Sequence, residues 1–325
     1  MTTTKRGTAR PVDLAQVSDT LAAIEDNVRS VLQGKPDTVR LALITLVAEG
    51  HLLIEDVPGV GKTLLAKALA RSIDCSVARV QFTPDLLPSD VTGVTVYSPD
   101  TGKFEFRPGP VFANLVLGDE INRAGPKTQS ALLESMEERT VTVDGTTYEL
   151  ARPFMVIATQ NPIELEGTYP LPEAQRDRFL MRVAIGYPHQ DEELEILRTH
   201  GGEDRLRALG PVTDAAAVSK AAVAVRQVHV AESVERYIVA LCRATRSHPD
   251  VELGASPRAA LGLLRASRAA AALAGRDFVL PDDVKTLALH VLPHRLILDP
   301  EAQLAGRDPL HVAAEVVDGV PAPTE

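Results

Sequence analysis

The chain has 325 residues, which is enough for about two domains of ordinary size. Hydrophobic residues make up 45% and charged residues 24%, a composition that excludes a wholly disordered chain and a membrane-embedded one. The formal net charge is -10, from 44 acidic and 34 basic residues, which argues against a surface that binds DNA or RNA over its whole extent. Aromatic residues are only 4%, so platforms for stacking bases are poorly supplied.

The two cysteines and the N-terminal stretch favour a cytoplasmic protein. Cys75 and Cys242 are far apart and have no partner at a metal-binding spacing, so we expect free thiols in a reducing compartment. Residues 1–10 are polar, carry three basic residues and precede no apolar segment, which argues against a secretory signal. The longest near-apolar run, residues 41–48, is too short to cross a bilayer, so we expect no membrane insertion.

Strands alternate with helices over the first part of the chain. Residues 1–13 are polar and predict a flexible leader. Apolar spacing predicts helices over 14–34, 36–48 and 62–72, and short apolar runs predict strands over 51–55, 78–82, 115–119, 154–159 and 181–185. This alternation predicts an α/β fold with a parallel sheet that helices cover on both faces.

Two insertions and a change of pattern complete the organisation. Residues 91–107 are β-rich, and residues 140–150 alternate around Asp144-Gly145, which predicts a hairpin. After Tyr187-Pro188 only helical spacing remains, so residues 188–298 are expected to form a helical domain. From residue 299 to 325 there are six acidic residues and one arginine, which predicts a solvated acidic tail.

The segment from Asp56 to Thr63 lies between a strand and a helix and predicts a phosphate-binding loop. Its glycines allow backbone N–H groups to approach phosphate oxygens, and the helix N-terminus adds positive potential. We expect Lys62 to reach the β- and γ-phosphates of ATP and Thr63 to ligate Mg²⁺. The pattern usually begins with glycine where this chain has Asp56. Nucleotide contacts are expected from Pro58, Gly59, Val60, Gly61, Lys62, Thr63 and Leu64.

Polar residues follow the ends of two further strands. Side chains alternate along a strand, so the adjacent Asp119 and Glu120 can serve different sites. We expect Asp119 to hold Mg²⁺ through water and Glu120 to polarise the attacking water. Asn161 ends the next strand, at the rim where α/β sheets bind ligands, and can contact the γ-phosphate or orient that water. A solvated strand end and a turn before Pro162 are the structural alternatives.

Four segments together resemble the MoxR family of AAA+ ATPases, in order from about residue 31 to about residue 293. They are Gly59-Val60-Gly61-Lys62-Thr63, Gly118-Asp119-Glu120-Ile121-Asn122-Arg123-Ala124, Ala158-Thr159-Gln160-Asn161-Pro162 and Leu171-Pro172-Glu173-Ala174-Gln175-Arg176-Asp177-Arg178-Phe179. The resemblance implies an AAA+ αβα P-loop NTPase core (14–187), a C-terminal helical lid (188–298), Mg²⁺-dependent ATP hydrolysis and a ring, usually hexameric. The hairpin 140–150 and the segment 91–107 match elements that face the pore or the substrate in related rings.

The resemblance also assigns roles to single residues. Asn161 matches sensor 1, and Arg178 matches the arginine finger that a subunit presents to the γ-phosphate of its neighbour. A second arginine, Arg176, leaves the choice of finger open, and a salt bridge of Arg178 with Asp177 or Glu173 is the structural alternative.

Two further segments are expected to reach the nucleotide. Arg258 matches sensor 2 at the start of a lid helix capped by Ser256, and we expect it to share one nucleotide with Lys62 of its own chain. Residues Val31 to Gly34 match the region that lines the adenine, although they also fit a plain helix stop.

These expectations combine into a cytoplasmic ring ATPase that remodels or matures a partner protein. The resemblance implies chaperone-like action, often on partners that contain a von Willebrand factor A domain. A motor acting on nucleic acid is an alternative that the net charge and the few aromatic residues disfavour. A non-hydrolysing nucleotide-binding scaffold is the second alternative, and the intact set Lys62, Thr63, Asp119, Glu120 and Asn161 argues against it.

Overall fold

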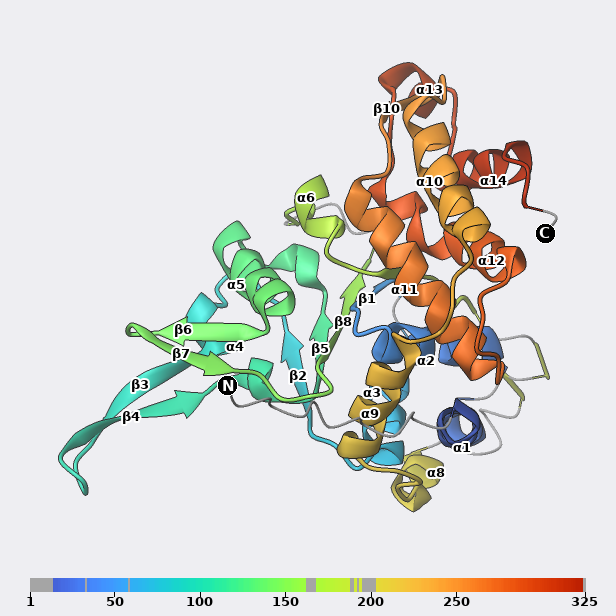
Figure 1. The fold of residues 1–325 in the computed structure, drawn as a ribbon. Helices are drawn as coiled ribbons and strands as arrows, with labels where there is room; N and C mark the ends of the chain where they lie inside the picture. Colours follow the sequence, from blue (N-terminus) through green and yellow to red (C-terminus); the bar gives the residue numbers. More distant parts are fainter. Residues whose placement is uncertain are drawn as a thin grey trace, which may run out of the picture.

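The fold is built on a parallel sheet of five strands. The computed structural model describes residues 14–32, 34–57, 59–161, 168–187, 190–191, 193–194 and 203–323, so the expected leader 1–13 and the expected boundary at Pro188 lie outside the described residues (Figure 1). The strands are β1 (Leu52–Glu55), β2 (Val77–Gln81), β5 (Leu115–Asp119), β8 (Met155–Gln160) and β9 (Met181–Val183). Their order is β2-β5-β8-β1-β9 and every pairing is parallel, which confirms the predicted α/β fold.

Helices cover both faces of the sheet because side chains alternate along each strand. Leu52 and Ile54 belong to one buried cluster, together with the apolar faces of α1 (Leu14–Val31), α2 (Pro36–Val47) and α3 (Lys62–Ser72). Leu53 belongs to a second cluster on the other face, with Leu132 and Leu133 of α5 (Pro126–Glu138). The result is the three-layer αβα core that the alternation of elements predicts.

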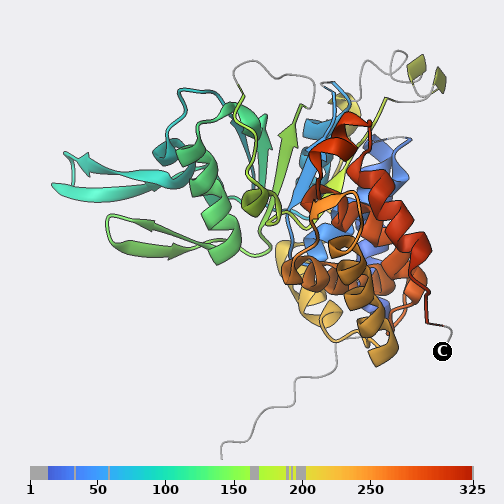
Figure 2. The same cartoon turned by 90° about the horizontal axis from the view of Figure 1, so that it is seen from above.

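Two hairpins extend from the side of the core that carries α5, away from the helical domain (Figures 1 and 2). One pairs β3 (Gly93–Ser98) with β4 (Lys103–Pro108), after the short helix α4 (Pro88–Thr92). The other pairs β6 (Thr140–Val143) with β7 (Thr146–Glu149) across the turn Asp144-Gly145, which confirms the expected hairpin. The rings of Phe106 and Tyr148 stack with centroids 4.3 Å apart and so join the two hairpins.

The second domain is helical, as expected, and packs on the first two helices of the chain. Its helices are α8 (Glu203–Ala208), α9 (Ala215–Val225), α10 (Glu232–Arg246), α11 (Pro257–Leu273) and α12 (Pro281–Val291), with a small ribbon of β10 (Val251–Leu253) and β11 (Ile297–Leu298). Side chains of α1, α2, α9, α10, α11 and α12 share one continuous buried cluster. The lid therefore has no separate core among the residues described.

The expectation of a solvated acidic tail is wrong for residues 300–319. These residues form α13 (Pro300–Leu304) and α14 (Pro309–Gly319), and Val312 and Ala313 of α14 are fully buried against the lid. The acidic side chains lie on the outer face, where Arg307 pairs with Glu315 and, at 2.7 Å, with Asp250. Counting charge missed the apolar stripe at helical spacing, so the lid continues to the end of α14.

The remaining elements are the short α6 (Glu173–Arg176) and the 3-10 turns η1 (Pro110–Phe112), η2 (Ile121–Arg123) and η4 (Pro293–Arg295). Both cysteines are free, and burial raises the pKa of Cys75 to about 12 and that of Cys242 to about 11. Among the described residues, none of the helices combines the length and the apolar character needed to cross a bilayer.

Candidate functional site

The loop between β1 and α3 has the backbone geometry of an anion cradle. Gly59 (φ +86°) and Gly61 (φ +98°) both adopt left-handed conformations that glycine tolerates best. Gly61 precedes the first turn of α3, whose N–H groups have no acceptor within the helix. A Cβ at Gly59 would meet no atom within 4 Å, which leaves room beside the loop for a ligand. Pro58 lies outside the described residues, so its contact stays a prediction.

Asp56, which stands where the usual pattern has glycine, fastens this loop to the end of β9. Its carboxylate accepts hydrogen bonds from the backbone N–H groups of Ile185 and Gly186, both at 2.6 Å, and of Val57 at 2.8 Å. The predicted strand extended to Ile185, but β9 ends at Val183. The N–H of Ile185 donates to Asp56 and not to a neighbouring strand. The departure from glycine thus has a structural role of its own.

Lys62 is the first residue of α3 and lies over the loop. Its Nζ donates to the backbone oxygen of Asp56 at 2.7 Å. Burial lowers the pKa of Lys62, and the negative charges of Asp56, Asp119 and Glu120 oppose that shift. The ammonium of Lys62 is therefore close enough to Asp119 and Glu120 to feel their negative charge, and it lies between the loop and the end of β5.

Asp119 ends β5 and is 8% exposed. Its Oδ2 accepts from Nε of Arg79 on the neighbouring strand β2 at 2.6 Å, and its Oδ1 accepts from the hydroxyl of Thr159 on β8 at 3.3 Å. Sequence reasoning missed both partners. The register of the sheet brings all three residues to the same edge, because β5 pairs with β2 on one side and with β8 on the other.

Strand alternation does not set the direction of the Glu120 side chain, because Glu120 is not part of the strand. It lies beyond the end of β5 in the left-handed region (φ +58°), and its backbone N–H donates to the hydroxyl of Thr159 at 2.9 Å. A non-glycine residue in this conformation is held there by its surroundings. The carboxylate accepts from Gln81 at 2.8 Å and from Arg123 at 3.0 Å.

The remaining residues expected at this edge are also placed there. Gln160, the last residue of β8, is paired with Glu55 of β1, so Asn161 follows it at the same edge as the phosphate loop. Thr63 lies in the first turn of α3, next to Lys62. The hydroxyl of Thr63 and the carboxylate of Asp119 are hard oxygen donors, the kind that Mg²⁺ accepts while it keeps several waters. This donor set fits the ion.

The turn after α1 lies against the phosphate loop. Helix α1 ends at Val31, and Gly34 has φ +72°. The side chain of Leu32 comes within 3.1 Å of where a Cβ on Gly61 would be. Val60 and Leu64 pack at the border of the same buried cluster as Leu32. An apolar wall beside the loop is thus in place, and its contact with an adenine ring stays a prediction.

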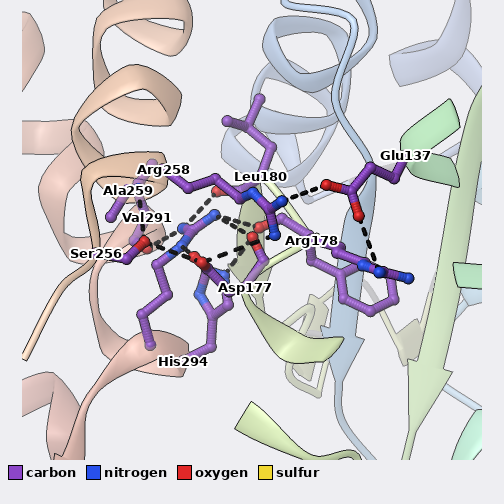
Figure 3. A network of polar contacts seen from close by, with 11 residues as sticks. Glu137, Asp177, Arg178, Leu180, Ser256, Arg258, Ala259, Val291 and His294 are labelled. Carbon is purple, nitrogen blue, oxygen red and sulfur yellow. Dashed lines mark hydrogen bonds and ion pairs between the residues drawn. The ribbon is translucent and has the colours of Figure 1, made fainter. Parts of the chain in front are cut away.

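Arg178 and Arg258 lie at the opposite edge of the sheet. Leu180, two residues after Arg178, donates its backbone N–H to the backbone oxygen of His51 at 2.8 Å. His51 directly precedes β1, so this segment lies at the amino end of that strand. Arg178 pairs with Glu137 at the end of α5, with 2.9 Å between Nη2 and Oε2. Arg258, from the first turn of α11, pairs with the other oxygen of the same carboxylate (Figure 3).

The structure does not bring Arg258 beside Lys62 of its own chain, and the expectation that the two share one nucleotide stays a prediction. Lys62 follows the carboxyl end of β1, whereas Arg258 lies beyond the amino end of the same strand, at the edge that carries Arg178. The reason is the docking of the lid, since α11 packs against α1, α2 and α12 with its N-terminus beside Glu137. No local sequence pattern reports that orientation.

Asp177 ties the lid to the core beside this pair of arginines. Its Oδ1 accepts from Nε of the buried Arg295 at 2.7 Å, and its Oδ2 accepts from the hydroxyl of Ser256 at 2.9 Å (Figure 3). Ser256 also caps α11, as expected, by accepting from the N–H of Ala259 at 3.3 Å. Asp177 therefore bonds to the residue that starts the helix bearing Arg258.

A cleft of about 230 Å³ opens at this edge. Its charged lining consists of the guanidinium groups of Arg139, Arg178, Arg258, Arg265 and Arg295 and the carboxylates of Glu49, Glu137 and Asp177. Five cations against three anions make it a site that favours an added negative charge. Arg176 is not part of the lining and pairs with Glu173 at 3.9 Å, so of the two candidate fingers Arg178 is the one that faces the cleft.

Comparison with known proteins agrees with this architecture. Residues 51–181 match the ATPase family associated with various cellular activities (AAA), and residues 243–316 match the AAA lid domain. The chain is 50% identical to the uncharacterized protein YeaC of Bacillus subtilis over 92% of this chain and 94% of that protein. It is 42% identical to chaperone MoxR1 of Mycobacterium tuberculosis over 89% of this chain and 78% of that protein.

A crystal structure of a protein assigned as an ATPase, from Cytophaga hutchinsonii, superimposes with a TM-score of 0.90 at 39% identity. The superposition covers 96% of this chain and 97% of that one. Sequence, fold and the order of motifs agree, and this chain belongs to the MoxR family of AAA+ ATPases.

Proposed function

We propose that this chain hydrolyses ATP with Mg²⁺ in the loop between β1 and α3. Gly59, Gly61 and Lys62 receive the phosphates, because the two glycines belong to the loop that leads from β1 into α3, Lys62 begins α3, and the first-turn N–H groups of a helix favour an anion. Thr63 and Asp119 hold the ion, which when bound neutralises charge on the phosphate oxygens. Glu120 takes the proton of the attacking water and Asn161 orients that water.

We further propose that the active form is a ring, expected to be hexameric. The observation that carries this is the division of the site between two edges of the sheet. From His51 to Asp56 the strand advances five residues, roughly 17 Å at the rise of a β-strand, so Arg178 and Arg258 are remote from their own phosphate loop. The arginine-rich cleft contacts a nucleotide only if the next subunit in the ring places its phosphate loop against the cleft. This arrangement supports Arg178 as the arginine finger.

The work done by hydrolysis is proposed to be chaperone-like remodelling or maturation of a partner protein. The chaperone named among the relatives supports this. The β3–β4 hairpin is the proposed lever, because Tyr97 (53% exposed) and Phe104 (73% exposed) form an edge-to-face pair on its outer part. A partner with a von Willebrand factor A domain, and the cytoplasm as the location, are further parts of the proposal.

Two alternatives remain open to experiment. A motor on nucleic acid would bind single strands with an affinity that falls steeply with salt, and its ATP turnover would rise when nucleic acid is added. A scaffold that only binds ATP would show no turnover.

The decisive measurement is steady-state ATP hydrolysis by the wild type and by Glu120→Gln, with nucleotide binding measured in parallel. We expect Glu120→Gln to bind ATP and to lose at least about 100-fold in turnover, because the proton acceptor is gone while the phosphate loop is intact. Equal turnover in the two proteins would remove Glu120 from the mechanism. Absence of turnover in the wild type would favour the scaffold.

A further inference from the structure

The carboxylate of Glu137 pairs with two arginines of the cleft described above, Arg178 and Arg258. Glu137 accepts from Arg178 through Oε2, at 2.9 Å, and from Arg258 through Oε1 (Figure 3). The two arginines come from unrelated elements, the segment before β9 and the first turn of α11 in the lid. Arg258 also lies 4.0 Å from Oδ2 of Asp177, but among the described residues Glu137 is the carboxylate that both arginines share.

The backbone that carries Glu137 is itself fixed on both sides. The oxygen of the preceding residue, Met136, accepts from Nε2 of the buried His51 at 3.0 Å. Two residues after Glu137, the guanidinium of Arg139 donates to the carboxylate and to the backbone oxygen of Glu49, both at 2.8 Å. The end of α5 is thus anchored to the start of β1, and the carboxylate has a defined position.

The charge of Glu137 matters because two guanidinium groups repel each other at short range. A carboxylate between them offsets that repulsion and fixes the direction of both forks. Its side chain is 33% exposed, so solvent screens the attraction and the pairs add little to folding stability. The geometric effect, two cations side by side and aimed at one cleft, is the larger consequence.

We propose that Glu137 is a positioning residue that holds Arg178 and Arg258 together as one unit for binding the phosphate groups of the nucleotide in the neighbouring subunit. This inference rests on the proposed ring and adds to it the residue that organises the outer half of the site. Glu137 acts through the arginines and does not itself touch the nucleotide. Removing its charge should therefore impair the neighbour and leave the nucleotide affinity of its own chain unchanged.

The test uses mixed rings in which only the outer edge is altered. A chain with Lys62→Ala and Glu137→Gln is added in excess to wild-type chains, so that wild-type nucleotide sites face the altered edge. The matched controls are Lys62→Ala alone and Lys62→Ala with Glu138→Gln. Glu138 lies on the same turn of α5, is exposed, and forms no ion pair with another described residue. Thermal melting of each variant checks that the fold is retained.

We expect kcat per wild-type chain to fall about tenfold beside Glu137→Gln relative to both controls, with KM for ATP changed by less than about twofold. A second measurement separates positioning from a general loss of structure. In a chain that also carries Arg178→Ala and Arg258→Ala, Glu137→Gln should cause no further loss, because the groups through which it acts are absent.

Three results would overturn the proposal. These are a kcat equal to that of the controls, a kcat above them, and an undiminished effect of Glu137→Gln in the chain that lacks both arginines. Failure of the ring itself is distinguishable. In that case Arg178→Ala and Arg258→Ala, placed in the same position of the mixed ring, would also leave the wild-type sites unaffected.

Discussion

The ammonium of Lys62 lies 2.7 Å from the backbone oxygen of Asp56, the residue that opens its own phosphate loop. The same Asp56 accepts from the N–H groups of Ile185 and Gly186 with its side chain. Asp56 therefore bonds both to Lys62, through its backbone oxygen, and to the segment after β9, through its side chain. A glycine at this position could do only the first of these.

Replacing Asp56 by glycine, the usual residue, is expected to harm this protein. Three backbone N–H groups, those of Val57, Ile185 and Gly186, would lose their acceptor, at a cost of about 1–3 kcal/mol for each that stays buried. We expect the free energy of unfolding to fall by at least about 2 kcal/mol in chemical denaturation, and ATP affinity to fall with it. Asp100→Gly, in the exposed turn between β3 and β4, is the control. A variant as stable as the wild type would contradict the role assigned to Asp56.

Arg79 is expected to compete with Mg²⁺ for Asp119. Its guanidinium donates to Oδ2 of that carboxylate at 2.6 Å and is itself more than half exposed. Removing a positive charge near a dication site favours the ion by an amount of the order of three- to tenfold in affinity. Arg79→Met should therefore lower the Mg²⁺ concentration that gives half-maximal ATP turnover, whereas Arg79→Lys should not. A higher Mg²⁺ requirement in Arg79→Met would show that Arg79 supports the metal site.

The sequence was sufficient to predict that the residues of the proposed phosphate site lie at one edge of the sheet. Lys62, Glu120 and Asn161 each follow a predicted strand, and the ends of parallel strands meet at one edge of a sheet whatever their order. The register was not available, so Thr159, which bonds to both Asp119 and Glu120, went unnoticed. A hydroxyl residue near a strand end is too common to serve as a signal.

The outer half of the site could not be predicted for a different reason. Glu137 and Arg258 are 121 residues apart, and their contact depends on how the lid packs against α1 and α2. Helical spacing identifies the buried face of α11, but it does not say which end of that helix faces which edge of the sheet. The acidic tail was mispredicted for another reason, since the helical spacing of Val312 and Val316 is visible in the sequence but the prediction relied on net charge alone.

Arg178 is expected to serve the neighbouring subunit. Arg178→Ala should retain ATP binding and lose about 10³-fold or more in turnover, the range measured for fingers supplied in trans. Mixing it with Lys62→Ala should restore part of the activity, because some interfaces then combine an intact loop with an intact finger. Arg176→Ala is the comparison. A larger loss in Arg176→Ala than in Arg178→Ala would transfer the role to Arg176.

Buried His51 should make folding sensitive to mild acid. Burial lowers its pKa from 6.5 to about 3, and in the fold its Nδ1 accepts from the N–H of Val156 at 3.0 Å while Nε2 donates to Met136. Below pH 6.5 His51 binds a proton in the unfolded chain but stays neutral in the folded chain. The contribution of His51 to the free energy of unfolding is therefore fully present above pH 6.5 and is lost as the pH falls. The loss approaches about 1.4 kcal/mol per pH unit for one such group.

The measurement is the free energy of unfolding between pH 5.5 and 6.5 for the wild type and for His51→Gln, which keeps a donor and an acceptor but does not titrate. His294, whose pKa burial also lowers, contributes a slope of the same sign in both proteins. We expect the slope in His51→Gln to be smaller by about half a proton at pH 6.5 and by about 0.9 proton at pH 5.5. Identical slopes would mean that His51 is protonated in the folded chain.

Arg258 gives the sharpest distinction between the two ways in which the site can be assembled. If it serves its own chain, a ring that mixes Arg258→Ala with Lys62→Ala has no site with both groups, since each chain lacks one of them. If it serves the neighbour, as its pairing with Glu137 beside Arg178 indicates, the Arg258→Ala chain supplies an intact phosphate loop and the Lys62→Ala chain an intact outer edge. We therefore expect ATP turnover in the mixture and almost none in either protein alone. A mixture as inactive as its components, with mixed rings verified by mass spectrometry, would return Arg258 to the nucleotide of its own chain.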